Sequence, residues 1–511
     1  MANADSAGPR FSRRRFLGRV GVTATGLVAV GHGGGAGLEA HAAHAAKSRA
    51  DRFGRMFEGL KAFAQATPEV QAALTAFGAK DGPLDAKDDM SASPLELILN
   101  PGRNPDSAIP AGMTFLGQFV DHDVTFDLTS PLGVPTAPEQ TRNFREPALN
   151  LDSVYGGGFG DSRFVLPDGS MRVERCDPAN PRSREDLPRI GGSAVIADPR
   201  NDENLIIAGL HAAILLFHNR ALTHAQGDDA RVRFEEARRL TRWHYQWIVL
   251  HELLPAFVGQ ELVDRVLHRG RRFYRPSGEA FIPVEFQIAY RLHTLARPSY
   301  RANFTGGADG GPLFFFLFDP SQNGVADPND LRGGQRAARR FIDWQTFFGF
   351  PGFEAAMRTT KKLDRLISTP LFTLPVGAVA TGEPPFVLPQ RNLLRHLTWE
   401  LPSGQRLARE MEVDQLARSD LEELREFGHD FDRSTPLWHY VNAEAELMGG
   451  GQKLGPVGGG IVAEVLIGLL ELDPTSFLSQ PSWRPTLPAA YSGAGEFRMI
   501  DFLGFAGVAP A

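Results

Sequence analysis

The most informative segment of this 511-residue chain is Gly117-Gln118-Phe119-Val120-Asp121-His122-Asp123. Its apolar spacing predicts a helix over residues 111–124. On a helix, Gln118, Asp121 and His122 stand at positions i, i+3 and i+4 and share one face. Asp123 points away from that face. The stretch therefore offers an amide, a carboxylate and a base on one side, and a second carboxylate on the other side that is free to bind something else.

This arrangement suits proton transfer. A His that is neutral at working pH can take a proton from one oxygen of a peroxide and return it to the departing oxygen. The alternative is an acidic surface helix whose His is satisfied by a neighbour. The stretch taken alone leaves both interpretations open.

The pattern Gln-x-x-Asp-His-Asp resembles the distal motif of the animal-type haem peroxidases, the peroxidase–cyclooxygenase superfamily. The resemblance implies that His122 is the distal base and that Gln118 lies in the distal cavity. It places Asp121 where an ester to the haem forms, and Asp123 at a calcium-ligand position. The cofactors implied are haem b, free or ester-linked, and calcium. The fold implied is mainly α: one large haem-peroxidase domain with few short strands and long ordered loops.

A second motif follows at Asp198-Pro199-Arg200-Asn201-Asp202-Glu203-Asn204. Arg200 and Glu203 stand at the Arg-x-x-Glu spacing of the same superfamily. By resemblance, Arg200 stabilises negative charge on the departing peroxide oxygen, and Glu203 holds the position of a second haem ester. The other interpretation is an acidic cap at a helix N-terminus. Both can hold at once.

The segment Asn150-Leu151-Asp152-Ser153-Val154-Tyr155-Gly156 resembles the loop that completes the calcium site of these enzymes. Oxygen-bearing side chains alternating with carbonyls suit a hard cation. Asp123, Asn150 and Asp152 are the candidate ligands. An Asx-type turn without metal is the alternative.

The proximal side is predicted at Tyr290-Arg291-Leu292-His293-Thr294. By resemblance, its position after the two distal motifs makes His293 the candidate axial ligand of the haem iron. The alternative is an ordinary His of the core or surface. Asn392 resembles the residue that accepts the N–H of the proximal His, and Arg395 is a candidate partner for a haem propionate. For Asn392 and Arg395 the alternative is an ordinary polar helix face.

Tyr290 sets this segment apart from most peroxidases of the superfamily, which have Arg three residues before the His and Gly directly before it. The pattern Tyr-Arg-x-His is similar to that of the fatty-acid haem dioxygenases of the same superfamily. In those enzymes the equivalent Tyr forms a radical that abstracts hydrogen from a lipid. Tyr is also a good packing residue on a buried helix.

Elsewhere the patterning is mainly helical, and no internal repeat is found. Residues 80–110 are expected to be loop and the tail from Pro474 to be coil. Residues 128–204, which have little periodicity, are expected to form a long, ordered wrapping segment. Residues 458–471 are strongly apolar and expected to be buried. Helices are expected over 53–78, 204–224, 231–254, 284–297 and 391–411, with helical patterning over 412–445.

The N-terminus is typical of an export leader. Ser12-Arg13-Arg14-Arg15-Phe16-Leu17 precedes an apolar run and the A-x-A sequences at residues 40–42 and 43–45, which resembles a twin-arginine signal. The expected location is secreted or extracytoplasmic, with the twin-arginine machinery as a partner. The expected divisions are 1–45 as leader, 46–94 as a helical arm, 95–473 as the haem-peroxidase domain and 474–511 as a Pro- and Gly-rich tail.

Composition excludes several classes. The single cysteine, Cys176, rules out an intrachain disulfide, an iron–sulfur cluster and haem attachment through Cys-x-x-Cys-His. A net charge of −6 gives no sign of a nucleic-acid partner, and no segment is apolar and long enough to span a bilayer.

The leading hypothesis is a haem peroxidase, an enzyme that reduces hydrogen peroxide and oxidises small organic donors or halides, with a role in the response to oxidative stress. The second hypothesis is a fatty-acid haem dioxygenase that uses a Tyr290 radical. The third is a non-enzymatic exported protein on the same scaffold.

Overall fold

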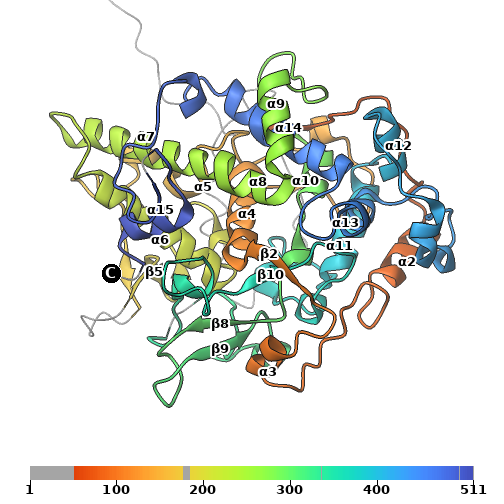
Figure 1. The fold of residues 1–511 in the computed structure, drawn as a ribbon, viewed down its shortest axis with the longest axis horizontal. Coiled ribbons are helices and arrows are strands. Elements are labelled where there is room, and N and C mark those ends of the chain that lie inside the picture. The colour runs from red at the N-terminus through yellow and green to blue at the C-terminus, as the bar shows by residue number, and fades with distance from the viewer. Residues whose placement is uncertain (1–50, 177–183, 335–336, 494, 510–511) are drawn as a thin grey trace, which may run out of the picture.

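The computed structural model describes residues 51–176, 184–334, 337–493 and 495–509, and Figure 1 shows their arrangement. Helices dominate. The longer ones are α2 (Pro68–Phe77), α4 (Ala111–Val124), α6 (Leu205–Ala221), α7 (Ala230–Ile248), α9 (Gln260–Arg269), α11 (Leu388–Thr398), α13 (Leu437–Met448) and α14 (Pro456–Leu472). The shorter ones are α3 (Pro94–Leu99), α5 (Asp152–Tyr155), α8 (Leu254–Val258), α10 (Val284–Ala289), α12 (Gly404–Glu410) and α15 (Met499–Ala506).

The described strands are short and form five two-stranded sheets. β1 (Phe53–Gly54) pairs with β7 (Ile282–Pro283) in parallel, and the other pairs are antiparallel. Those pairs are β2 (Asp106–Pro110) with β10 (Thr359–Lys361), β3 (Glu174–Arg175) with β4 (Glu185–Asp186), β5 (Arg189–Ile190) with β6 (Ser193–Ala194), and β8 (Ser299–Asn303) with β9 (Leu313–Phe316). The prediction of a mainly α fold with few short strands is confirmed.

Helix α4 lies near the centre of the molecule (Figure 1) and has the predicted bounds. The chain enters it from β2, and Pro110 stands directly before its first turn. Because Phe119 and Val120 are fully buried, tertiary packing fixes the rotation of the helix. That rotation decides where Gln118, Asp121 and His122 point.

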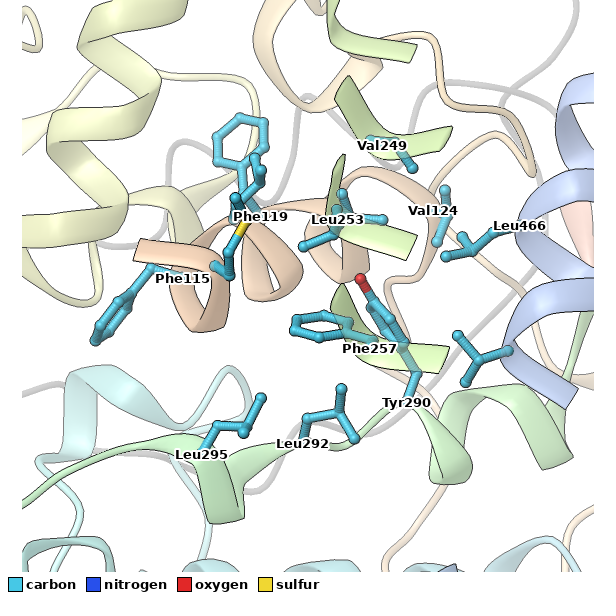
Figure 2. Close-up of a cluster of buried hydrophobic side chains, with 14 of the residues drawn as sticks. Phe115, Phe119, Val124, Val249, Leu253, Phe257, Tyr290, Leu292, Leu295 and Leu466 are labelled. Atoms are coloured by element: carbon cyan, nitrogen blue, oxygen red, sulfur yellow. The ribbon is translucent and has the colours of Figure 1, made fainter. Parts of the chain in front are cut away.

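Helices α6 and α7 also form where the sequence predicts them. Asn204 caps α6 by accepting from the backbone N–H groups of Ile206 and Ile207. After α7 the backbone continues through a π-helical turn, Val249–Leu253, into α8. Figure 2 shows side chains of this region, Val249, Leu253 and Phe257, beside those of α4.

The helix expected over residues 53–78 is wrong for its first half. Phe53 and Gly54 pair with β7 instead, and the backbone N–H groups of Met56 and Phe57 donate to the buried carboxylate of Glu285. Helix α2 begins only after Thr67, whose side chain caps it. Apolar spacing here reflects burial against the rest of the chain rather than a helical period.

The helix expected over 284–297 ends at Ala289, and His293 lies on a short 3₁₀ turn, His293–Leu295. The indole of Trp438 donates to the carbonyl of Arg291, 3.1 Å away, so a distant side chain satisfies the non-helical backbone. Similarly, the helix expected over 391–411 is split into α11 and α12, because Glu400 adopts a positive φ of 46° and Ser403 caps a new helix.

The loop expected over 80–110 contains α3 and β2. The tail expected to be coil contains α15, so that expectation is wrong too. Phe502 of α15 stacks on Phe217 of α6 with ring centroids 3.9 Å apart, and Glu252 accepts from the backbone N–H of Met499 at 2.6 Å. These tertiary contacts stabilise a helix too short to form alone.

The predicted leader, residues 1–45, lies outside the described residues. None of the helices in the described part of the chain has the length and apolar character needed to cross a membrane.

Candidate active site

A cavity of about 230 Å³ separates α4 from the segment that follows α10. Gln118, Asp121 and His122 line it from α4, as their shared face predicts, and His293 lines it from the opposite segment. The remainder of the wall is mostly apolar, including Phe115, Phe257, Leu292, Leu317, Phe318, Leu371, Leu374 and Leu388.

Gly117 makes room at this cavity. A Cβ at this position would lie 2.9 Å from the ring of Phe257 and 3.5 Å from the hydroxyl of Tyr290. Any larger residue would therefore push α4 away from the wall that carries Phe257 and Tyr290.

His122 is buried, and its Nδ1 lies 3.0 Å from Oδ1 of Asn201. Burial, with the nearby Arg200 guanidinium, lowers the pKa of His122 to about 3. The imidazole is therefore neutral near pH 7, and the contact with Asn201 leaves its Nε2 facing the cavity, 3.9 Å from Oε1 of Glu203. A neutral imidazole with one nitrogen free can act as a base.

Two carboxyl groups stand beside His122. Asp121 accepts from the hydroxyl of Thr125 at 3.0 Å, and Glu203 accepts from the amide of Gln118. Burial raises the pKa of Asp121, and it raises that of Glu203 to about 8 against the opposing effect of Arg200. Both predicted ester positions thus line the same cavity as His122.

Arg200 differs from the expectation that it faces the departing peroxide oxygen. Its guanidinium donates to Asp198 and to the carbonyl oxygens of His122 and Thr125, at 2.7, 3.0 and 2.6 Å. It lines a second cavity of about 140 Å³ rather than the one that His122 and His293 share. In this structure Arg200 holds the backbone at the end of α4.

Asp198 is the anchor of this arrangement, and sequence reasoning gave it no role. It is fully buried between Arg200 and Arg145, whose Nε lies 2.9 Å from it. Burial raises the pKa of Asp198, but the two guanidinium groups outweigh this effect and hold the pKa well below its usual range. The position of Asp198 two residues before Arg200 was the available signal, and nothing in the sequence pointed to Arg145.

On the proximal side, Nδ1 of His293 lies 3.2 Å from the amide nitrogen of Asn392, so the predicted pair is brought together. Burial lowers the pKa of His293 to about 3 and keeps the ring neutral, which a metal ligand needs. Arg291, which sequence analysis left without a role, donates to Oδ1 of Asn392 at 2.9 Å. Burial, with repulsion from Arg395, lowers its pKa to about 10.

Tyr290 also lines the cavity, and its hydroxyl has no hydrogen-bond partner among the residues that the structure describes. Figure 2 shows its side chain reaching from the proximal segment toward Leu253, with the ring of Phe257 beside it. Burial, followed by the charge of Asp121, raises its pKa well above the usual value. The hydroxyl therefore keeps its proton.

Arg395 lies at the second cavity with Arg200, Arg291 and Arg391. It forms an ion pair with Asp127 at 3.1 Å, and its Nε has no partner in the described part of the chain. Asp121 and Arg291 border both cavities, so the two lie next to each other. One is mostly apolar and the other is rich in cations.

These features fit haem. Two neutral His residues from separate elements line one mostly apolar cavity, and four Arg residues line the cavity beside it. An unpartnered Arg Nε there could bind a carboxylate. A porphyrin with two carboxylate side chains needs both environments.

The predicted calcium ligands are only partly assembled. Asp123 accepts from the hydroxyl of Ser153 and from the backbone N–H of Leu151, each at 3.1 Å. Burial and then Asp152 raise the pKa of Asp123 to about 8. The amide nitrogen of Asn150 instead donates to Glu146. Over the described residues, no group of three or more His, Cys, Asp or Glu side chains is arranged to hold a metal ion.

Comparison with known proteins agrees with this geometry. A family model described as animal haem peroxidase matches residues 142–310, which include Arg200, Glu203 and His293. The fold is that of the animal haem peroxidases. The matched residues are fewer than half of the chain, so the match shows similarity to that family over residues 142–310.

Solved structures of both kinds of enzyme share this fold. Peroxidase A from Dictyostelium discoideum matches with a TM-score of 0.57 and 15% identity, over 83% of this chain and 88% of its own. Fatty acid alpha-dioxygenase from Oryza sativa matches with a TM-score of 0.53 and 11% identity, over 80% of this chain and 74% of its own. Fatty acid alpha-dioxygenase from Arabidopsis thaliana matches with a TM-score of 0.53 and 13% identity, over 81% of this chain and 71% of its own. At these identities the matches establish the fold alone.

Proposed function

We propose that this protein is a haem-dependent peroxidase that reduces hydrogen peroxide and oxidises small organic donors or halides. One observation carries the proposal: His122 is neutral, and its Nε2 faces the same cavity as His293. A base and a candidate iron ligand thus share one cavity.

When bound, haem would supply the electron-transfer chemistry. His293 would hold the haem iron, and Asn392 would orient the ring of His293. Asp121 and Glu203 would occupy the ester positions, and Arg395 would pair with a propionate in the second cavity. The observations that support this arrangement are the burial of these groups and the position of the cationic cavity beside the apolar one.

The role of His122 is proton transfer. Its Nε2 takes the proton of the peroxide oxygen that binds, and returns it to the departing oxygen, which leaves as water. Gln118 and the neutral Glu203 lie beside this path. Two electrons from the donor, with two protons from an organic donor or, for a halide, from solvent, complete the reduction of one peroxide to two water molecules. Arg200 supports the step by holding the carbonyl of His122.

The test uses purified, haem-loaded protein with hydrogen peroxide and a phenolic donor. Wild type should oxidise the donor, and His122→Ala should lower the rate with peroxide by about 10²–10⁴. His268→Ala serves as the control, because His268 is an exposed residue of α9. A Soret band without donor oxidation, or full activity in His122→Ala, would contradict the proposal.

A fatty-acid dioxygenase is the second candidate, and Tyr290 favours it. Its hydroxyl is unpartnered in the described structure and lies on a wall that includes Phe257, Leu371 and Leu374, which suits an acyl chain. Haem-loaded protein should then consume oxygen with an unsaturated fatty acid, and Tyr290→Phe should abolish the uptake while peroxide chemistry survives. An absence of uptake with any fatty acid would count against it.

Calcium binding remains a proposal, with Asp123 and Asp152 as ligands and Asn150 as the third candidate. Asp123 is buried and interacts electrostatically with the half-buried Asp152, whose Oδ1 has no partner within the described structure, and this favours a cation between the two carboxyl groups. If the ion binds, a chelator should lower the melting temperature of wild type. The chelator should have no effect on Asp123→Ala.

Export by the twin-arginine route is likewise proposed from residues 1–45. Expression with the leader intact should yield a shortened protein outside the cytoplasm, and Arg13→Lys combined with Arg14→Lys should retain it inside. The non-enzymatic alternative predicts a folded protein that gives no Soret band when mixed with haem.

A further inference from the structure

We propose that His211 is a positioning residue that acts through Asn201 to fix the tautomer of His122. This inference rests on the proposed function, because it assigns the device that keeps Nε2 of the base free of a proton. Neither Asn201 nor His211 lines the cavity that His122 and His293 share.

Three buried side chains from three elements form a chain of hydrogen bonds. Oδ1 of Asn201 lies 3.0 Å from Nδ1 of His122, and Nδ2 of Asn201 lies 3.1 Å from Nδ1 of His211. Asn201 is fully buried, and His122 and His211 are 4% and 1% exposed. Water therefore has little access to these contacts.

The two ends of an amide have opposite hydrogen-bonding roles. Oδ1 of Asn201 can only accept, so Nδ1 of His122 must carry the hydrogen. A neutral imidazole has a single N–H, which leaves Nε2 of His122 bare and able to take a proton. If the amide were reversed, Nδ2 would donate to His122, and Nε2 would carry the hydrogen instead. That tautomer could not act as the base.

His211 opposes the reversed arrangement. Its bare Nδ1 accepts from Nδ2 of Asn201, and this contact satisfies a buried donor that would otherwise be left without a partner at a cost in stability. The ring of His211 is itself held on α6 against Phe119 of α4, with centroids 6.2 Å apart. Without an acceptor at position 211, either end of the amide could face His122.

The experiment reads the tautomer directly. Haem-free protein labelled with ¹⁵N-histidine is examined by NMR in the imidazole region, and the His122 signal is assigned by its loss in His122→Gln. Wild type should show hydrogen on Nδ1 and a bare Nε2. His211→Leu and Asn201→Leu should show both tautomers of His122. In haem-loaded protein these variants should react with peroxide about two- to tenfold more slowly, the range expected for loss of one hydrogen bond.

Two variants should preserve the wild-type tautomer. Asn201→Asp keeps an acceptor facing His122, and His211→Gln keeps an acceptor for the amide of Asn201. His218→Leu is the matched control, because it removes a buried His from the same helix that bonds Tyr155 and Gly169 instead. It should leave the His122 signal unchanged.

A proton on Nε2 of His122 in wild type would overturn the inference, as would a single, unchanged tautomer in both Leu variants. If the Leu variants do not fold, wild type and Asn201→Asp decide the question. Failure of the proposed function is a separate result, because it appears as a missing Soret band or as a lack of peroxide reaction in wild type.

Discussion

The wall of the cavity that carries His122 and the wall that carries His293 are built differently. The first is a regular helix, α4, and its polar groups have dedicated partners in Asn201, Glu203, Thr125 and Arg200, the last held by Asp198. The second begins where a helix ends, and it includes a Tyr hydroxyl with no partner in the described structure.

The two walls therefore suit two different chemical requirements. A base must be held in one tautomer and one orientation, which requires a connected set of buried hydrogen bonds. A residue that acts on a bound lipid must instead leave its reactive atom free. The wall that carries His122 meets the first requirement and therefore favours a peroxidase. Tyr290, on the other wall, meets the second requirement and therefore favours a dioxygenase.

The largest change in stability is expected when the charge cluster of the wall that carries His122 is broken. Asp198→Ala leaves the buried guanidinium groups of Arg145 and Arg200 without their shared partner, so the free energy of unfolding should fall by about 3–5 kcal/mol. Urea denaturation at neutral pH measures it. Asp161→Ala is the control, because Asp161 pairs with the exposed Arg163 and should cost about 0–1 kcal/mol. An equal loss of unfolding free energy in the two variants would show that the buried charge cluster stabilises the wall of His122 no more than a surface ion pair does.

A smaller effect is expected at the proximal wall. Asn392→Leu removes the contact that orients His293, so haem affinity should fall about 10- to 100-fold. Titration with haem, followed at the Soret band, measures the change. The exposed Asn323 supplies the control, Asn323→Leu, which should bind as wild type does. Wild-type affinity in Asn392→Leu would mean that the proximal wall does not depend on this residue.

Glu203 and His293 should affect the free energy of unfolding over different pH ranges. The pKa of Glu203 is raised from 4.5 to about 8, so its neutral form stabilises the fold fully below pH 4.5 and this contribution is lost as the pH rises through about 8. The pKa of His293 is lowered from 6.5 to about 3, so its contribution is present above pH 6.5 and is lost as the pH falls.

Glu203→Gln should therefore flatten the fall in stability between pH 6.5 and 8, by at most about 1.4 kcal/mol per pH unit. Unfolding of haem-free protein in urea at several pH values measures the slope. The exposed Glu410, changed to Gln, should leave the slope as in wild type. The same slope in Glu203→Gln and wild type would show that Glu203 is ionised in the folded state.

The smallest expected effect belongs to Tyr290. Because its hydroxyl has no partner in the described structure, Tyr290→Phe should change the free energy of unfolding by no more than about 0.5 kcal/mol. In Tyr274, by contrast, the hydroxyl donates to the carbonyl and accepts from the N–H of Phe281. Tyr274→Phe should cost about 1–3 kcal/mol. A comparable loss in Tyr290→Phe would show that its hydroxyl has a structural role.

Regular segments could be predicted well from the sequence. The bounds of α4 followed from its apolar spacing, and the shared face of Gln118, Asp121 and His122 followed from the helical period. The pairing of His293 with Asn392 followed from the resemblance alone, because no local pattern links residues so far apart. Segments stabilised by distant partners were predicted poorly: Glu285 holds residues 56 and 57 out of a helix, and α15 exists because it packs on α6.

The sequence by itself determined which groups are available for chemistry: the base, the two carboxyls, the candidate iron ligand and the unusual Tyr290. These depend on residue identity and on the 3.6-residue period of a helix, both of which are local. Three further features are visible only in the folded chain: where Arg200 points, which end of the Asn201 amide faces His122, and the lack of a partner for the Tyr290 hydroxyl in the described structure. Those features depend on buried partners such as Asp198 and His211, which become neighbours only when the chain is packed.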